Sequence, residues 1–526
     1  MNLNGEWEFG AGDVQRFDRR IVVPFAPQSD LSGIGECEAD VVWYRRRFDA
    51  PGSDRLLLHF GAVDYRATVW VNGEVVARHE GGHTPFAADV AHVIREHDNE
   101  LVVRAEDPVD GAELPRGKQL SDALQGPWFY AASTGIWQTV WLEPLPARAI
   151  ESLRVKPDFD ARGVEFEIGG EGEKRVIATF GGRPVGEWSG DGSKGRILLD
   201  EFHAWSPEEP NLYGLEASCG SDHVSSYFGL RKVETKDGRF WLNGQPYVQR
   251  LVLDQGYFPG GLLTAGSDAE LRRDIVLAKA MGFNGARKHQ KVEDPRWLYW
   301  ADTLGFLVWA EMANYHRHSA QAEARLQAEW EQRVLRDRDQ PSIVAWVPVN
   351  ESMGLKGMEP DVMAALLMRL YRLTHVLDGT RLVMSNDGWQ HTVSDLCTLH
   401  DYAPAGILRR RYSTVDRALE TAAREQPPYL PGFEYRGEPI VLSEFGGIAL
   451  ASSGAFGYTQ VAGADELLDS YREMVEALMQ PGPVEGFCYT QLTDIDSEQN
   501  GLLTFERRPK VDVELLRRAT ETPKRP

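Results

Sequence analysis

The sequence IVAWVPVNE, residues 343–351, ends a short apolar run with an asparagine and a glutamate. Its β-branched residues predict a buried strand, and Pro348 predicts the strand's end because proline cannot donate to a sheet ladder. The same layout returns in PIVLSEFGG, residues 439–447. Glu351 or Glu444 alone could be a helix cap, a surface charge or a buried ion-pair partner. Two carboxylates at the carboxyl ends of two buried strands instead indicate a barrel enzyme that cleaves glycosidic bonds.

Strands and helices alternate from about residue 236 onward, which is typical of a parallel sheet covered by helices. A capping box at residues 267–270 and the helix start Asp294-Pro295 mark two of the helices. Eight strands are predicted, at residues 251–253, 283–287, 306–310, 343–347, 381–385, 395–399, 439–443 and 484–490. This count predicts a C-terminal (β/α)8 TIM barrel over residues 236–526, with Glu351 after the fourth strand and Glu444 after the seventh.

The first 235 residues are predicted to be almost entirely β. The dipeptide Asn72-Gly73 lies between two apolar runs, at residues 67–71 and 74–77, and is the strongest short-range signal for a hairpin. Residues 1–145 have the strand pattern of a sandwich, and residues 146–235 have short strands at the spacing of a second, smaller sandwich. We therefore expect a multidomain protein with two β-sandwich domains before the barrel.

The 526 residues include 57 Lys and Arg against 79 Asp and Glu, a formal net charge of −22. That charge repels phosphate backbones and anionic membranes, so we expect neither a nucleic-acid nor a membrane partner. The four cysteines are scattered and form no Cys-x-x-Cys motif, which favours buried thiols over disulfides or a zinc site. The N-terminus lacks an apolar leader region. These features predict a cytoplasmic protein, and we expect no cofactor and no metal.

Motifs distributed over nearly the whole chain resemble those of glycoside hydrolase family 2, which includes β-galactosidases, β-glucuronidases and β-mannosidases. Residues 135–142, GIWQTVWL, are similar to the motif that ends the family's jelly roll, and residues 205–213 to its immunoglobulin-like domain. Motifs of the family's barrel match at residues 284–287, 294–295, 350–352 and 443–446. The resemblance implies a jelly-roll sandwich over residues 1–145, an immunoglobulin-like sandwich over 146–235 and a catalytic barrel over 236–526.

The resemblance also implies roles for five residues. Glu351 matches the general acid/base and Glu444 the nucleophile. Asn350 matches the residue that holds the sugar 2-hydroxyl, Arg287 a second-strand arginine near the nucleophile, and Tyr402 an aromatic residue whose hydroxyl approaches it. A nucleophile must be ionised, and a neighbouring arginine lowers a carboxyl pKa. The acid must arrive protonated, so we expect Glu351 to have the drier and less cationic surroundings.

Further candidates follow from position alone. Asp254 follows the first barrel strand and Trp389 the fifth, so both could contact substrate, although a turn or cap explains an aspartate equally well. His289 and His400 could ligate a metal, but the sequence names no partners for them. For both histidines we prefer a structural or sugar-contacting role.

These residues predict a retaining exo-glycoside hydrolase with a carbohydrate substrate. The loop Ser497 to Leu502 lacks the Asn-x-Lys of the family's glucuronidases, so we expect a neutral sugar, with β-galactosides before arabinosides, mannosides and glucuronides. The alternative is a non-catalytic carbohydrate-binding protein on the same scaffold. The resemblance also makes a homo-oligomer an expectation, since sandwich domains often supply interfaces.

Overall fold

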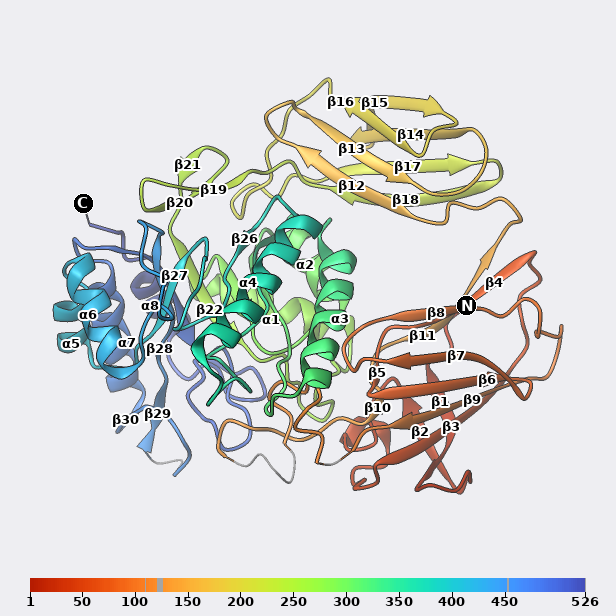
Figure 1. Cartoon of the computed structure of the whole chain (residues 1–526), viewed down its shortest axis with the longest axis horizontal. Coiled ribbons are helices and arrows are strands. Elements are labelled where there is room, and N and C mark those ends of the chain that lie inside the picture. Colours follow the sequence, from red (N-terminus) through yellow and green to blue (C-terminus); the bar gives the residue numbers. More distant parts are fainter. Residues whose placement is uncertain (109, 121–125, 452–453, 526) are drawn as a thin grey trace.

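A computed structural model of the chain describes every residue except 109, 121–125, 452–453 and 526. Three bodies follow one another along the chain: an N-terminal sandwich, a second sandwich and a barrel (Figure 1). The two sandwiches lie on one side of the barrel, and the helices α5 to α8 lie on the other (Figure 1). The fold class that the sequence predicts is therefore confirmed.

The N-terminal sandwich packs a six-stranded sheet against smaller sheets. Its strand order is β2-β1-β3-β9-β6-β7, opposite the sheets β11-β4-β8 and β10-β5. The predicted hairpin is confirmed as β6 and β7, and Asn72 and Gly73 have φ of 52° and 87°, as a tight two-residue turn requires. The elements are β1 (Gly5–Ala11), β2 (Arg19–Val23), the 3-10 turn η1 (Asp30–Ser32), β3 (Val41–Phe48), β4 (Arg55–Phe60), β5 (Val63–Asp64), β6 (Arg66–Val71), β7 (Glu74–Glu80), β8 (Phe86–Asp89), β9 (Asn99–Glu106), β10 (Gly135–Ile136) and β11 (Val140–Leu145).

The second sandwich consists of a three-stranded sheet, β12-β13-β16, and a four-stranded sheet, β15-β14-β17-β18. Alternating side chains such as Val164, Phe166 and Val176 fill the space between them. A small sheet of β19, β20 and β21 then leads into the barrel. These strands are β12 (Leu153–Asp158), β13 (Gly163–Ile168), β14 (Lys174–Phe180), β15 (Arg183–Gly190), β16 (Lys194–Leu198), β17 (Tyr213–Cys219), β18 (Asp222–Phe228), β19 (Val233–Lys236), β20 (Arg239–Leu242) and β21 (Gln245–Pro246).

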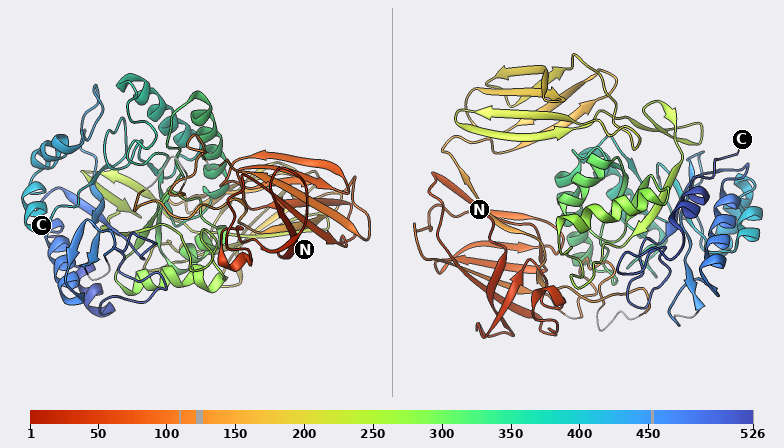
Figure 2. Two further views of the ribbon diagram at one scale, coloured as in Figure 1. Left: turned by 90° about the horizontal axis from the view of Figure 1, so that it is seen from below. Right: turned by 180° about the vertical axis from the view of Figure 1, so that it is seen from behind.

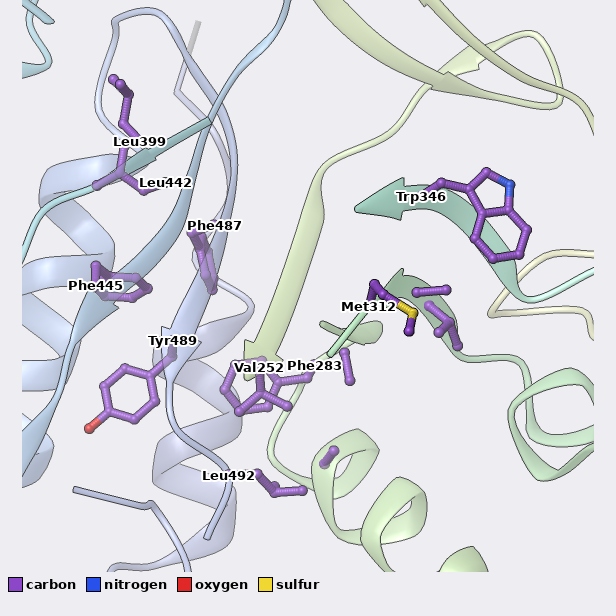
Figure 3. Close-up of a cluster of buried hydrophobic side chains, with 14 of the residues drawn as sticks. Val252, Phe283, Met312, Trp346, Leu399, Leu442, Phe445, Phe487, Tyr489 and Leu492 are labelled. Carbon is purple, nitrogen blue, oxygen red and sulfur yellow. The ribbon is translucent and has the colours of Figure 1, made fainter. Parts of the chain in front are cut away.

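The barrel contains the eight predicted strands, all paired in parallel, in the order β26-β25-β24-β23-β22-β31-β28-β27. Most residues of these strands are buried because helices cover the sheet, and large side chains such as Trp346, Phe445 and Phe487 belong to its apolar core (Figure 3). The strands are β22 (Gln249–Asp254), β23 (Gly285–Lys288), β24 (Leu307–Glu311), β25 (Ile343–Val347), β26 (Leu382–Val383), β27 (Cys397–His400), β28 (Ile440–Gly446) and β31 (Val484–Thr490).

Helices follow each barrel strand except β26, which leads directly to β27, as the sequence pattern predicts. Ser267 caps the first, and Asp294 with Pro295 starts the second. The helices are α1 (Asp268–Ala280), α2 (Pro295–Leu304), α3 (Ala320–Asp337), α4 (Pro360–Leu377), α5 (Ala405–Arg411), α6 (Val415–Glu425), α7 (Ala464–Leu478) and α8 (Val513–Thr520); the short strands β29 (Ile448–Leu450) and β30 (Thr459–Val461) precede α7.

The strands β26 and β27 are the two ends of the sheet order, so the barrel closes between them without a regular ladder. Instead, the Asp395 N–H donates to the Val383 carbonyl at 3.0 Å, and the Asp395 carboxylate accepts from the Val383 N–H at 2.7 Å. Among the residues that follow β26, Asp387 forms a bridge with Asn350 beyond the end of β25.

The segment of the N-terminal sandwich that links β9 to β10 reaches the barrel, and both views of Figure 2 place the two parts side by side. The N–H groups of Arg116 and Gly117 donate to the Asn314 carbonyl at 3.2 and 3.0 Å. The Tyr130 hydroxyl donates to the Glu498 carboxylate, in the loop after the last barrel strand. The sandwich therefore forms part of the rim at the carboxyl ends of the barrel strands.

Candidate active site

A pocket of about 760 Å³ opens at the carboxyl ends of the barrel strands. The barrel lines it with both candidate carboxylates and with aromatic and histidine side chains, and the N-terminal sandwich adds a lysine and two aromatic rings. The lining includes Glu351, Glu444, Trp389, His400 and Tyr402 from the barrel, and Lys118, Trp128 and Phe129 from the sandwich. This is where (β/α)8 enzymes bind their substrates.

Glu351 stands on strained backbone just beyond β25. Strand-like pairing continues past the end of the strand, because Asn350 bridges Asp387 and the Glu351 N–H donates to the Asp387 carbonyl at 2.9 Å. Glu351 and Ser352 then have φ of 53° and 49°, a left-handed conformation that non-glycine residues rarely adopt. Such strain persists where the surroundings impose it, which is common at functional sites.

Arg287, at the end of β23, is fully buried and connects the strand ends. Its Nε donates to Glu311 at 2.7 Å, and its Nη1 lies 2.8 Å from both Glu444 Oε1 and Asp387 Oδ2. Its Nη2 donates to the Asn350 Oδ1 at 2.5 Å. Arginine can hold this many acceptors because its donors lie in a fixed planar fork.

Glu444 lies on β28 and is almost fully enclosed, with a side chain 7% exposed. Besides the contact with Arg287, its Oε2 accepts from the Tyr402 hydroxyl at 2.5 Å. Burial acts to raise the pKa of Glu444, but the charges of His400 and Arg287 outweigh it and lower the pKa below its usual value. An ionised carboxylate in this place can act as a nucleophile.

Glu351 has different surroundings. Its side chain is 29% exposed, and its Oε1 lies 2.7 Å from the His400 Nδ1. Burial acts to raise the pKa of Glu351, but the hydrogen bond with His400 outweighs it and lowers the pKa. The expectation of a drier site for Glu351 is therefore wrong, because Glu351 is more exposed than Glu444. The arginine does contact Glu444 rather than Glu351, but His400 is a cationic partner of Glu351 that the sequence did not reveal.

The two candidate carboxylates face one another across the pocket. One oxygen of Glu351, one oxygen of Glu444 and a ring nitrogen of His400 all lie within 4.8 Å of one another. Retaining glycosidases have carboxyl groups about 5–5.5 Å apart, whereas inverting enzymes have them about 6.5–9.5 Å apart to admit a water molecule. The separation of the nearest oxygens is closer to the retaining spacing than to the inverting one.

Most of the other sequence candidates gather around this pair. The Asn350 Nδ2 is buried just behind the pocket lining and has no hydrogen-bond partner among the residues that the structure describes. The Trp389 ring lies 5.5 Å from the His400 ring and lines the pocket. His289 lies behind the pocket, with its Nδ1 3.0 Å from Glu311 and 3.1 Å from Arg287.

Asp254 is the candidate that the structure keeps apart from the pair. Its Oδ2 lies 2.7 Å from the Lys288 Nζ, and its Oδ1 accepts from the Gly256 N–H at 2.8 Å. Lys288 also pairs with Glu293 at 2.7 Å. Asp254 thus belongs to a buried ion-pair network and is not among the side chains that line the pocket.

Sequence reasoning missed several residues of the site. Asp387 and Glu311 contact Arg287, and Glu498 lies in the rim loop, where burial raises the pKa of its carboxyl. Asp387 was visible in the sequence as the neighbour of Trp389, but Lys118 comes from another domain. Only the tertiary fold brings Lys118 to the pocket.

Comparison with known proteins agrees with this geometry. The family model described as glycosyl hydrolases family 2, TIM barrel domain, matches residues 233–522. The models described as glycosyl hydrolase 2 galactose-binding domain-like and as glycosyl hydrolases family 2 match residues 21–126 and 149–231. The chain belongs to glycosyl hydrolases family 2. It is therefore a glycoside hydrolase, as its sequence predicts.

Relatives within this family carry two different names. A beta-glucuronidase of Paenibacillus borealis is 25% identical over 90% of this chain and 87% of its own length. A beta-galactosidase of Photobacterium profundum is 26% identical over 86% of this chain and 43% of its own length. A solved Faecalibacterium prausnitzii beta-glucuronidase superposes with a TM-score of 0.81 at 23% identity, covering 100% of this chain and 98% of that one.

The helices α1 to α8 all belong to the barrel domain. Within the described part of the chain, none combines the length and the apolar character needed to cross a lipid bilayer.

Proposed function

We propose that the protein is an exo-acting retaining glycosidase that uses Glu444 as nucleophile and Glu351 as general acid/base. The observation that carries this proposal is the approach of the two carboxylates, whose nearest oxygens lie within 4.8 Å of one another. That separation supports direct attack on the sugar rather than the water-mediated attack of an inverting enzyme. Walls from both the barrel and the sandwich support binding of a chain end.

In the first step, a Glu444 oxygen attacks the anomeric carbon while the bond to the leaving oxygen breaks. The electron pair of that bond goes to the leaving oxygen, which takes a proton from Glu351. The sugar is now an ester of Glu444. Arg287 and Tyr402 support this step because both hold Glu444 by hydrogen bonds, of 2.8 and 2.5 Å, and fix its orientation.

In the second step, a water molecule attacks the anomeric carbon of the ester and gives its proton to Glu351. The bond to Glu444 breaks, and the carboxylate returns to its ionised form beside Arg287. Two inversions give net retention of configuration. The unpartnered amide of Asn350 supports binding of the sugar 2-hydroxyl, since a bond there strengthens in the transition state.

For the sugar itself we propose a neutral glycoside, with β-galactosides first. The loop after the last barrel strand supports this choice, because Ser497 to Leu502 lacks the Asn-x-Lys of the family's glucuronidases.

A glucuronide is the second candidate because of one observation. Lys118 lines the pocket, and its ammonium has no carboxylate within ion-pair distance among the residues that the structure describes. Relatives named beta-glucuronidase give this candidate further support. A sugar carboxylate could form an ion pair with Lys118. The charge of Lys118 also acts on Glu351 and Glu498, where it acts to lower the pKa of each carboxyl.

A panel of 4-nitrophenyl glycosides tests the function and the sugar together. We expect turnover of the β-galactoside above that of the arabinoside, mannoside and glucuronide. Turnover of the glucuronide alone would reverse the ranking. If the protein binds oligosaccharides in calorimetry but cleaves no member of the panel, the non-catalytic alternative is correct. Light scattering on the same sample tests the expected homo-oligomer, which a mass of 59.0 kDa at micromolar concentration would contradict.

A further inference from the structure

His400 lies between carboxylates on both of its ring nitrogens. It ends β27, and its side chain is 2% exposed. Its Nδ1 lies 2.7 Å from Glu351 Oε1, and its Nε2 lies 3.0 Å from Asp387 Oδ2. The ring packs against Gly388, where a Cβ atom would approach it to 2.7 Å, so only glycine leaves room for this position. These two carboxylate contacts limit which nitrogens of His400 can carry a proton.

Asp387 determines that the Nε2 of His400 carries a proton. The same Oδ2 lies 2.8 Å from Arg287 Nη1, so Asp387 sits against a permanent positive charge that lowers its pKa and keeps it ionised. An ionised carboxylate oxygen can only accept hydrogen bonds. The Nε2 of His400 must therefore carry a proton, which it donates to Asp387.

The contact between Nδ1 and Glu351 also needs a proton. A bare Nδ1 and an ionised Oε1 would face one another with lone pairs at 2.7 Å, which is repulsive. Either His400 is an imidazolium that donates to ionised Glu351, or Glu351 is protonated and donates to neutral His400. In both forms the pair shares one proton beyond the one on Nε2.

The other charges around the ring decide how firmly that proton is held. Glu444 Oε2 lies 3.5 Å from Nδ1, and Arg287 Nη1 lies 3.4 Å from Nε2. His289, His391 and Lys118 are the further titratable groups that act on this cluster. Burial acts to lower the pKa of His400, but Glu444, Asp387 and Glu351 together raise it to about 10.

We propose that His400 is a positioning residue that stores the catalytic proton with Glu351 and releases it when Glu444 loses its charge. This inference rests on the function proposed above and extends it, because it assigns the acid role to a pair of residues. Asp387 supports the pair by keeping the Nε2 proton in place, so that the proton on the other nitrogen is the one that moves.

When Glu444 attacks, its negative charge disappears into a neutral ester, and the strongest charge that favours protonated His400 is lost. The shared proton passes through the Glu351 carboxyl to the leaving oxygen, which departs as an alcohol. His400 is then neutral and Glu351 ionised, so that their lone pairs face one another, and this repulsion favours the return of a proton to the pair. In the second step, the attacking water gives its proton to this pair, and the released Glu444 carboxylate holds it there again.

The first test measures the proton directly and needs no substrate. Nitrogen-15 spectra of the histidine-labelled full chain report whether each ring nitrogen carries a proton, and the signal missing from His400→Gln identifies His400. We expect His400 to be an imidazolium at pH 7 and to lose its proton only at a pH near 10. In Glu444→Gln we expect the midpoint to fall by about one pH unit or more, because an opposite charge within a few ångströms is lost.

The second test measures the use of the proton. We compare His400→Gln with His391→Gln, which removes another buried imidazole, one that bonds Thr398 and Ser394. In His400→Gln we expect kcat/KM to fall about 100-fold for alkyl glycosides and less than about threefold for 2,4-dinitrophenyl glycosides, which need no proton. The alkaline limb of its pH profile moves to lower pH. In His391→Gln any loss is equal for both substrates and the limb stays in place.

These outcomes separate the inference from the proposed function. If the wild type cleaves no glycoside, the proposed function fails, while the spectra still decide the state of His400. A neutral His400 at pH 7, or a midpoint unmoved by Glu444→Gln, overturns the inference even if the enzyme is active. An equal loss for good and poor leaving groups in His400→Gln also overturns it, since a merely structural role would have that effect.

Discussion

The two sides of the pocket hold their carboxylates in different ways. On one side Glu444 is 7% exposed and fixed by a buried arginine and a tyrosine hydroxyl. On the other side Glu351 is 29% exposed and bonded to a histidine. The first arrangement keeps a charge in one place, and the second allows a proton to move. The difference suggests how two glutamates come to have separate roles in one pocket.

Removing the fixed carboxylate should have the largest effect. We expect Glu444→Ala to lower kcat by about 10⁴-fold or more, because the proposed mechanism forms the ester on Glu444. Added azide should restore part of the activity and give a glycosyl azide of inverted configuration. NMR spectroscopy of the glycosyl azide determines its anomeric configuration. An azide product of retained configuration would place the nucleophile elsewhere.

Removing the Glu351 carboxylate should have an effect that depends on the leaving group. We expect Glu351→Ala to slow alkyl glycosides by about 10²–10⁴-fold and dinitrophenyl glycosides far less, because only the former require protonation. Steady-state kinetics on a graded series of aryl glycosides measures the dependence. A uniform loss across the series would remove the contrast between the two sides.

Substitution of Lys118 tests whether the N-terminal sandwich contributes to sugar binding on the Glu351 side of the pocket. If a substrate carboxylate binds there, Lys118→Met should raise KM for the glucuronide about 10–100-fold and leave galactoside kinetics nearly unchanged, since a charged hydrogen bond contributes about 1.5–3 kcal/mol. Lys118→Arg, which keeps the charge, should restore part of the affinity. Lys356→Met is the matched control, because Lys356 also lines the pocket but is exposed. Equal effects on both sugars would mean that Lys118 does not read the charge of the sugar.

Asp254 should have the smallest effect on catalysis. It lies in the buried network with Lys288, so Asp254→Asn should lower the free energy of unfolding by about 3–5 kcal/mol, because it leaves a buried lysine with one partner fewer. We expect kcat to change by less than about threefold. Urea unfolding and steady-state kinetics on one preparation measure both. A large loss of kcat in a stable variant would return Asp254 to the substrate site.

The sequence predicted the parts of the site that lie at strand ends. Glu351 and Glu444 were visible because each closes an apolar run, and Asn72-Gly73 fixed its hairpin by local turn chemistry. Strand positions in the barrel agree within a few residues because the apolar runs are short and bounded by turn residues. Local patterns of this kind survive into the fold because the residues that set them are neighbours in sequence.

The relations between distant segments could not be predicted in this way. His400 was recognised, but not that it bonds Glu351, because 49 residues separate them and the barrel alone brings them together. The expected dry site for the acid was wrong for the same reason. Lys118 was missed because a sandwich segment crosses to the barrel through contacts such as Gly117 with Asn314, which leave no periodic signal in the sequence.

The stereochemistry of the reaction tests the central claim most directly. Proton NMR of the sugar that forms in the first minutes, before mutarotation, distinguishes the two anomers. With carboxylate oxygens within 4.8 Å of one another, we expect a β-glycoside to release the β-anomer first. Release of the α-anomer would show that water attacks the substrate directly, and it would contradict the assignment of Glu444 as nucleophile.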